Sequence, residues 1–393
     1  MSGAMSWRFL KLYILTLMFF SANAILNVFI PLRGHDLGAT NTVVGVVMGA
    51  YMLTAMVFRP WAGQIIAKIG AIKVLRLILV INAAALMLYG FTGLEGYLIA
   101  RIMQGVCTAF FSMALQIGII NALPEDHRAE GVSLYSLFST IPNLIGPFIA
   151  VGIWQWQHMS VFGIVMIVIA LSTMLFGYQV TKDTHDSENP SEHEDVPFNA
   201  ITVFSQFFKN KELFLCGCMM IGASVIFGAV SVFMPLYTVN HTFAHAGIFL
   251  TIQAIAVVVS RFYLRKYIPS DGRWHARFMM IVFALLVVGA FIIAIGPHLN
   301  HLIFYISAIM IGVTQAMVYP TLTTYLSFTL PTRGRHMLLG LFIACADLGI
   351  SLGGTIMGPV SDWLGFQWMY LICSCLACVM MVMSYAMKKI LVK

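Results

Sequence analysis

Twelve apolar runs divide this chain, and each is long enough to cross a lipid bilayer. Hydrophobic residues make up 60% of the 393 residues, charged residues only 9%, and the mean hydropathy is +0.90. A soluble domain carries about 25% charged residues, whereas a bilayer span needs about 20 mostly apolar ones. We therefore predict an all-α membrane protein with twelve transmembrane helices. The runs cover residues 10–31, 40–58, 74–92, 96–121, 130–153, 158–179, 213–237, 245–264, 277–296, 301–328, 335–358 and 366–387.

The basic residues fall on one side of these spans. Twenty of the twenty-two Lys and Arg residues lie in the two tails and in every second loop, while Arg33 occupies the other side and Arg101 lies inside the fourth span. Cytoplasmic loops are enriched in Lys and Arg. We therefore expect a multi-pass protein of the bacterial plasma membrane with both termini in the cytoplasm. The same bias explains the net charge of +7, so this charge gives no reason to expect nucleic-acid binding.

Two halves of the chain repeat one another at an offset of 207 residues. The offset maps Arg101–Val106 onto Ala308–Val313 and Gly146-Pro147 onto Gly353-Gly354. A looser echo, at an offset of 202, pairs Arg59-Pro60 with Arg261-Phe262. Such parallel repeats are typical of one large class of transporters. We predict two pseudo-symmetric six-helix bundles, residues 1–180 and 213–393, joined by an acidic cytoplasmic linker at 181–212.

Three motifs resemble the major facilitator superfamily over the length of the chain. They are Leu98-x-x-Arg101-x-x-Gln104-Gly105-x-x-x-Ala109 in the fourth span, Gly63-x-Ile65-x-x-Lys68-x-Gly70-x-x-Lys73 after the second, and Pro142-x-x-x-Gly146-Pro147 in the fifth. The loop motif departs from the family pattern at Ala67, where the family has Asp. The third resembles the motif of proton-driven exporters, but Pro142, Ala150 and Val151 stand where that motif has Gly.

The resemblance implies a secondary exporter that works by alternating access, with proton entry as the driving reaction. Residues 12–24 and 130–139 resemble members of the family that export a small metal-chelating opine, a metallophore. The ligand rests on that resemblance alone. A multidrug antiporter of the same fold and an importer are alternatives.

Two charged residues lie deep within the spans, where an ionised side chain is costly and usually functional. Arg101 offers a planar fork to carboxylates, so it is a candidate for substrate binding; a purely structural Arg is the alternative. Asp347 lies at mid-span in the eleventh helix. A carboxyl group there can change protonation when its surroundings alternate between dry and wet, so Asp347 is the candidate for proton coupling. As alternatives to proton coupling, Asp347 could bind an amine of the substrate or could be a neutral, structural residue.

Other polar side chains recur at helical spacing inside the spans and predict a polar interior. The candidates for substrate contact are Asn23, Asn27, Tyr51, Gln104, Gln253, Gln315, Tyr319 and Ser351. They could instead tie helices together. The candidates for gating or helix packing are Arg59, Gly63, Gly70, Gly146 and Pro147.

Several other activities find no support in the sequence. The seven cysteines fall within spans, and no His or Cys spacing matches a metal site, so we expect neither a bound metal nor a cofactor. The chain lacks a Gly-x-x-x-x-Gly-Lys loop for ATP and the His-Glu-x-x-His motif of a zinc protease. An intramembrane enzyme and a signalling receptor remain alternatives to a monomeric transporter of small molecules.

Overall fold

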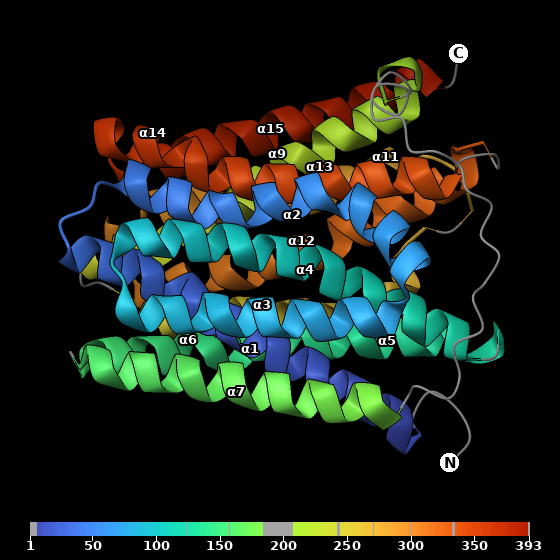
Figure 1. Cartoon of the computed structure of the whole chain (residues 1–393). Coiled ribbons are helices and arrows are strands. Elements are labelled where there is room, and N and C mark those ends of the chain that lie inside the picture. Colours follow the sequence, from blue (N-terminus) through green and yellow to red (C-terminus); the bar gives the residue numbers. More distant parts are fainter. Residues whose placement is uncertain are drawn as a thin grey trace. The chain divides into compact units, whose positions relative to one another are not determined.

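Long α-helices account for almost all of the chain that the computed structural model describes, which is residues 6–123, 125–156, 158–183, 207–241, 244–269, 271–298, 300–331 and 335–391 (Figure 1). Twelve helical stretches of these residues are long and apolar enough to cross a membrane. The prediction of an all-α protein with twelve spans is confirmed.

The helices keep close to the predicted runs. In the first half they are α1 (Trp7–Asp36), α2 (Asn41–Ile69), α3 (Ala71–Phe91), α4 (Leu94–Ala122), α5 (Glu125–Thr140), α6 (Pro142–Gln155) and α7 (Met159–Asp183). In the second half they are α9 (Lys211–His241), α10 (Ala246–Tyr263), α11 (Ala276–Ala294), α12 (His301–Thr329), α13 (Arg335–Thr355), α14 (Met357–Leu364) and α15 (Phe366–Leu391), with 3-10 turns at Arg265–Tyr267 and Gly296–His298.

Two spans consist of two helices each, and proline explains both breaks. The fifth span is α5 followed by α6, and the eleventh is α13 followed by α14. Pro142 and Pro359 have no N–H with which to continue the helical hydrogen bonds, so the ladder is interrupted near Ile141 and Ile356.

The second helix is longer than predicted. The prediction that Arg59, Gly63 and Lys68 belong to a loop after the second span is wrong, because α2 continues through Ile69. Pro60 removes one hydrogen bond without ending the helix. The chain turns at Gly70, whose φ of 93° lies in the left-handed region that favours glycine.

The chain forms two compact units: Met1–Arg33 with Ala50–Val196, and Gly34–Gly49 with Pro197–Lys393. The beginning of α2 therefore packs with the second unit and the remainder of α2 with the first. Most of the predicted linker at 181–212 lies outside the described residues; its described ends are Thr181–Asp183 in α7 and residues 207–212. The acidic linker stays a prediction.

The same packing scheme recurs in the two units. In the first unit α3 packs against α4 and α7, and in the second α11 packs against α12 and α15. These are the third, fourth and sixth spans of each half, so the repeat read from the sequence is also a repeat of helix contacts. Each unit has its own apolar core; the rings of Phe19 and Phe111, for example, stack with centroids 3.8 Å apart in the first.

Candidate functional site

Arg101 on α4 is fully buried in the first unit and is bound by two amides of α1. Its Nη1 donates to Asn23 Oδ1 at 2.6 Å and its Nη2 to Asn27 Oδ1 at 3.1 Å. Asn23 and Asn27 are one helical turn apart, so their side chains leave the same face of α1 and reach the two ends of the guanidinium. The structure thus joins three of the residues singled out in the sequence.

Two further predicted residues complete this cluster. The Arg101 Cζ lies 5.3 Å from the centroid of the Tyr51 ring. The Tyr51 hydroxyl shares a 2.9 Å hydrogen bond with Thr108 Oγ1, and the Tyr89 hydroxyl donates to Gln104 Oε1 at 2.6 Å. Thr108 and Tyr89 were not among the residues predicted from the sequence. Thr108 lies one turn beyond Gln104 on α4, a spacing that could have identified it, whereas Tyr89 is a single polar group on α3.

The described partners of the Arg101 guanidinium, the Asn23 and Asn27 amides and the Tyr51 ring, are neutral. Burying a cation is costly unless it is paired or hydrogen-bonded. Here two amide oxygens and the negative face of an aromatic ring offset that cost.

The second unit contains its own pair of amides. Gln253 on α10 is 8% exposed, and its Nε2 donates to Gln315 Oε1 on α12 at 3.0 Å. Tyr319, one turn beyond Gln315, stacks on Phe342 of α13 with ring centroids 6.0 Å apart. These contacts join α10, α12 and α13; Gln253, Gln315 and Tyr319 were identified from the sequence, whereas Phe342 was not.

Asp347 and Ser351 lie one turn apart on α13 and are both buried, at 6% and 1% exposure. Ser351 Oγ donates to the backbone oxygen of Gly49 at 2.9 Å, so its hydroxyl already has a partner on α2. Arg101 and its neighbours therefore belong to the first unit, whereas the Gln pair, Tyr319, Asp347 and Ser351 belong to the second.

The predicted packing positions differ in their surroundings. A Cβ on Gly146 would collide with Ala24 of α1, so α6 and α1 approach at this point, next to the buried Pro147. A Cβ on Gly63 would meet open space, whereas Gly70 is required for its φ. Arg59 is half-buried within α2, directly before Pro60.

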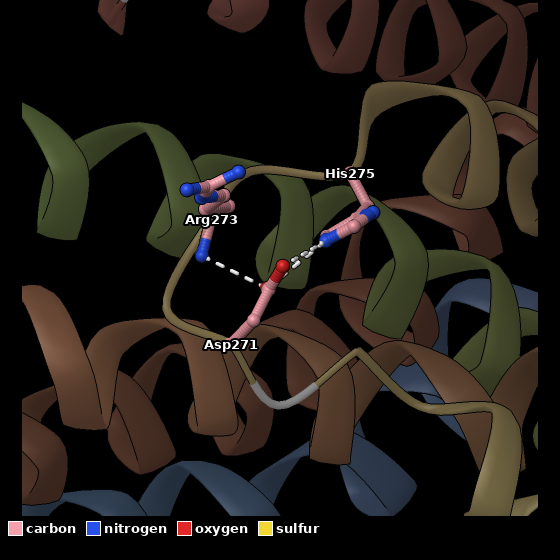
Figure 2. Close-up of polar contacts among 3 residues, drawn as sticks. All are labelled: Asp271, Arg273 and His275. Carbon is pink, nitrogen blue, oxygen red and sulfur yellow. Dashed lines mark hydrogen bonds and ion pairs between the residues drawn. The ribbon is translucent and has the colours of Figure 1, made fainter.

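Figure 2 shows a polar turn before α11. The Asp271 carboxylate accepts the backbone N–H of Arg273 at 3.1 Å and contacts His275 Nε2 at 2.9 Å. The bond to His275, followed by that to the Arg273 N–H, lowers the pKa of Asp271 below its ordinary value. Trp274 fastens the turn to α15 by donating its indole N–H to Ser384 O at 2.9 Å. These contacts order a loop.

No cluster of three or more His, Cys, Asp or Glu side chains that could hold a metal occurs among the described residues. The seven cysteines are free thiols.

Twelve spans arranged as two repeats, with a hydrogen-bonded Arg buried inside one of them, define a polytopic transporter. The model of the Major Facilitator Superfamily matches residues 12–353 and 272–389. The chain belongs to the major facilitator superfamily.

Known proteins of this family match the whole chain. A "Staphylopine export protein" of Staphylococcus aureus is 71% identical over 388 residues, covering 99% of this chain and 98% of that protein. Among solved structures, the nucleoside transporter NupG superposes with a TM-score of 0.77 at 17% identity, over 98% of this chain and 100% of that one. A bacterial homologue of the human lysosomal transporter Spinster, inward-facing and occupied, gives a TM-score of 0.74 at 10% identity over 97% and 96%. Both structures share the fold.

Proposed function

We propose that this chain exports staphylopine, or a metallophore very like it, across the plasma membrane by alternating access. One observation carries the proposal: the 71% identity to a staphylopine export protein extends over nearly the full length of both chains. An identity this high, over almost every residue of both proteins, supports a common substrate as well as a common fold.

The experiment is deletion of the gene in its host, followed by mass spectrometry of cytosol and medium. The expected result is a metallophore that accumulates inside the cell and disappears from the medium, with both changes reversed by the intact gene. A matched efflux assay with cationic dyes addresses the multidrug alternative. Unchanged metallophore in the medium combined with lost dye efflux would overturn the proposal in favour of that alternative.

Arg101 is the proposed contact for an anionic group of the substrate. In support, its terminal nitrogens meet the oxygens of Asn23 and Asn27, which a carboxylate can replace with a gain in bond strength. Tyr51 and Gln104 are proposed to complete this contact. Replacing Arg101 with Lys keeps the charge and loses the fork, so we expect export to fall at least tenfold. Undiminished export would remove carboxylate binding from the proposal.

Asp347 is the proposed proton-coupling group. It is a buried acid in the middle of α13, and a carboxyl group in such a place responds to changes in hydration. In vesicles with an imposed pH gradient, Asp347→Asn is expected to abolish uphill export while ligand binding remains. Uphill export at the wild-type rate in this variant would exclude the role.

The orientation and assembly are proposals as well. The bias of Lys and Arg toward alternate loops supports cytoplasmic termini, and reporter fusions at both ends would test it. We further propose a monomer without enzymatic activity, since transport by this fold requires neither a partner subunit nor a covalent step.

A further inference from the structure

The internal repeat aligns two hydrogen bonds that lie in different halves of the chain. In the first unit Tyr51 on α2 bonds to Thr108 on α4, and in the second Gln253 on α10 bonds to Gln315 on α12. The offset of 207 maps Thr108 onto Gln315, and the offset of 202 maps Tyr51 onto Gln253. The second span of each half is thus tied to the fourth by the same pair of positions.

The backbone confirms that these positions correspond. A Cβ on Gly105 would collide with the backbone oxygen of Tyr51, and a Cβ on Gly312, 207 residues later, would collide with that of Gln253. The two glycines let the helices approach closely at the same point in each bundle. Tyr51 and Gln253 therefore occupy equivalent places.

The two positions nevertheless have different chemistry. The Tyr51 hydroxyl is bound to Thr108, and its ring lies beside the Arg101 guanidinium. Gln253 uses its Nε2 for Gln315, and its own Oε1 is buried with no hydrogen-bond partner among the described residues. An acceptor left unpaired in a buried place destabilises the protein unless something else supplies a donor.

We propose that Gln253 Oε1 accepts a hydrogen bond from a protonated nitrogen, an ammonium or imidazole N–H, of the transported molecule. The inference rests on the proposed function, because it assigns this atom to the exported metallophore. A neutral acceptor in a site of low dielectric binds a cationic N–H donor more strongly than it binds water. The first half thus contains a cation, Arg101, which suits a carboxylate. The second half contains an acceptor, Gln253 Oε1, which suits an amine.

The test is calorimetric titration of the purified full-length protein with staphylopine. Gln253→Met keeps the size of the side chain and removes the acceptor, so its Kd is expected to rise at least tenfold. Gln253→Glu keeps an acceptor oxygen and adds a negative charge that attracts the cationic donor, so its Kd is expected to equal or fall below that of wild type. The control is Thr321→Val on α12, which removes a buried hydroxyl that is bonded within its own helix to Met317 O, and its Kd is expected to stay within threefold of wild type.

The outcomes separate the two proposals. If the wild-type protein does not bind staphylopine, the proposed function fails. If the wild type binds and Gln253→Met binds equally well, the acceptor role is overturned while the proposed function stands. Thermal unfolding in the same detergent checks that each variant is folded. If Gln253→Met does not fold, Gln253→Glu decides, because a tenfold loss in that folded variant would equally overturn the role.

Discussion

The carboxylate of Asp362 on α14 caps the start of α2 through Thr42. Its Oδ2 accepts the Thr42 backbone N–H at 2.8 Å and the Thr42 hydroxyl at 2.6 Å, while its Oδ1 accepts the Asn41 N–H at 2.9 Å. The first N–H groups of a helix have no partner inside the helix and attract negative charge. An acid 320 positions away in sequence thus does the work of a local N-cap, within the second unit.

Replacing Asp362 with Asn should lower stability. The amide has one acceptor oxygen where the carboxylate has two, and it has no charge to interact with the helix dipole, so we expect a loss of about 0.3–1 kcal/mol. Thermal unfolding in detergent measures it. Thr42→Val removes only the hydroxyl bond and should produce a smaller loss. A larger effect of Thr42→Val than of Asp362→Asn would contradict the capping role.

Ser351 should matter for stability and not for substrate affinity. Its hydroxyl donates to Gly49 O, where α13 contacts the beginning of α2. Hydrogen bonds between membrane helices contribute about 0.6 kcal/mol on average, so Ser351→Ala should lower the unfolding free energy by about that amount. The KM for export should be unchanged. A raised KM with unaltered thermal stability would instead return Ser351 to the substrate site.

The spans and the candidate polar residues could be predicted because both depend on local sequence, on apolar runs and on helical spacing. Asn23 and Asn27 share a face at a spacing of four residues, and Arg101 is conspicuous in an apolar run. Their mutual contact could not be predicted, since it depends on how α1 and α4 are rotated and offset along their axes.

Two hydrogen-bonding partners, Tyr89 and Asp362, could not be predicted from the sequence for the same reason. Tyr89 and Asp362 belong to no periodic pattern, and each is defined by a residue on another helix. Asp362 looks like an ordinary acid at a span end until α2 is beside it. The continuation of α2 past Pro60 was missed because charge and Pro near a span end suggest a loop, although α2 remains helical for another nine residues.

The paired glycines give a prediction that tests the repeat itself. Gly105→Ala and Gly312→Ala each place a methyl group against the backbone of a neighbouring helix. We expect each to lower the unfolding free energy by about 1–3 kcal/mol, the usual effect of overpacking. Gly118→Ala, on the same helix as Gly105 but facing open space, is the control and should be neutral or stabilising by up to about 1 kcal/mol. Equal effects at Gly105 and Gly118 would contradict the close approach.

The turn before α11 should respond to acid through Asp271. Because His275 and the Arg273 N–H lower the pKa of this carboxyl group in the folded protein, ionised Asp271 stabilises the turn above its unfolded pKa of about 3.9. That contribution is lost as the pH falls through the lower, folded value. His275→Ala removes the largest cause of the shift, so the acid-induced loosening of the turn should move to higher pH. Trp274 fluorescence reports on the turn, since its indole is hydrogen-bonded to Ser384. The emission of Trp274 is obtained by subtracting the spectrum of the Trp274→Phe variant. The pH midpoint of its change should be higher in the His275→Ala protein than in the wild type. An identical midpoint in both proteins would show that His275 does not hold the carboxylate.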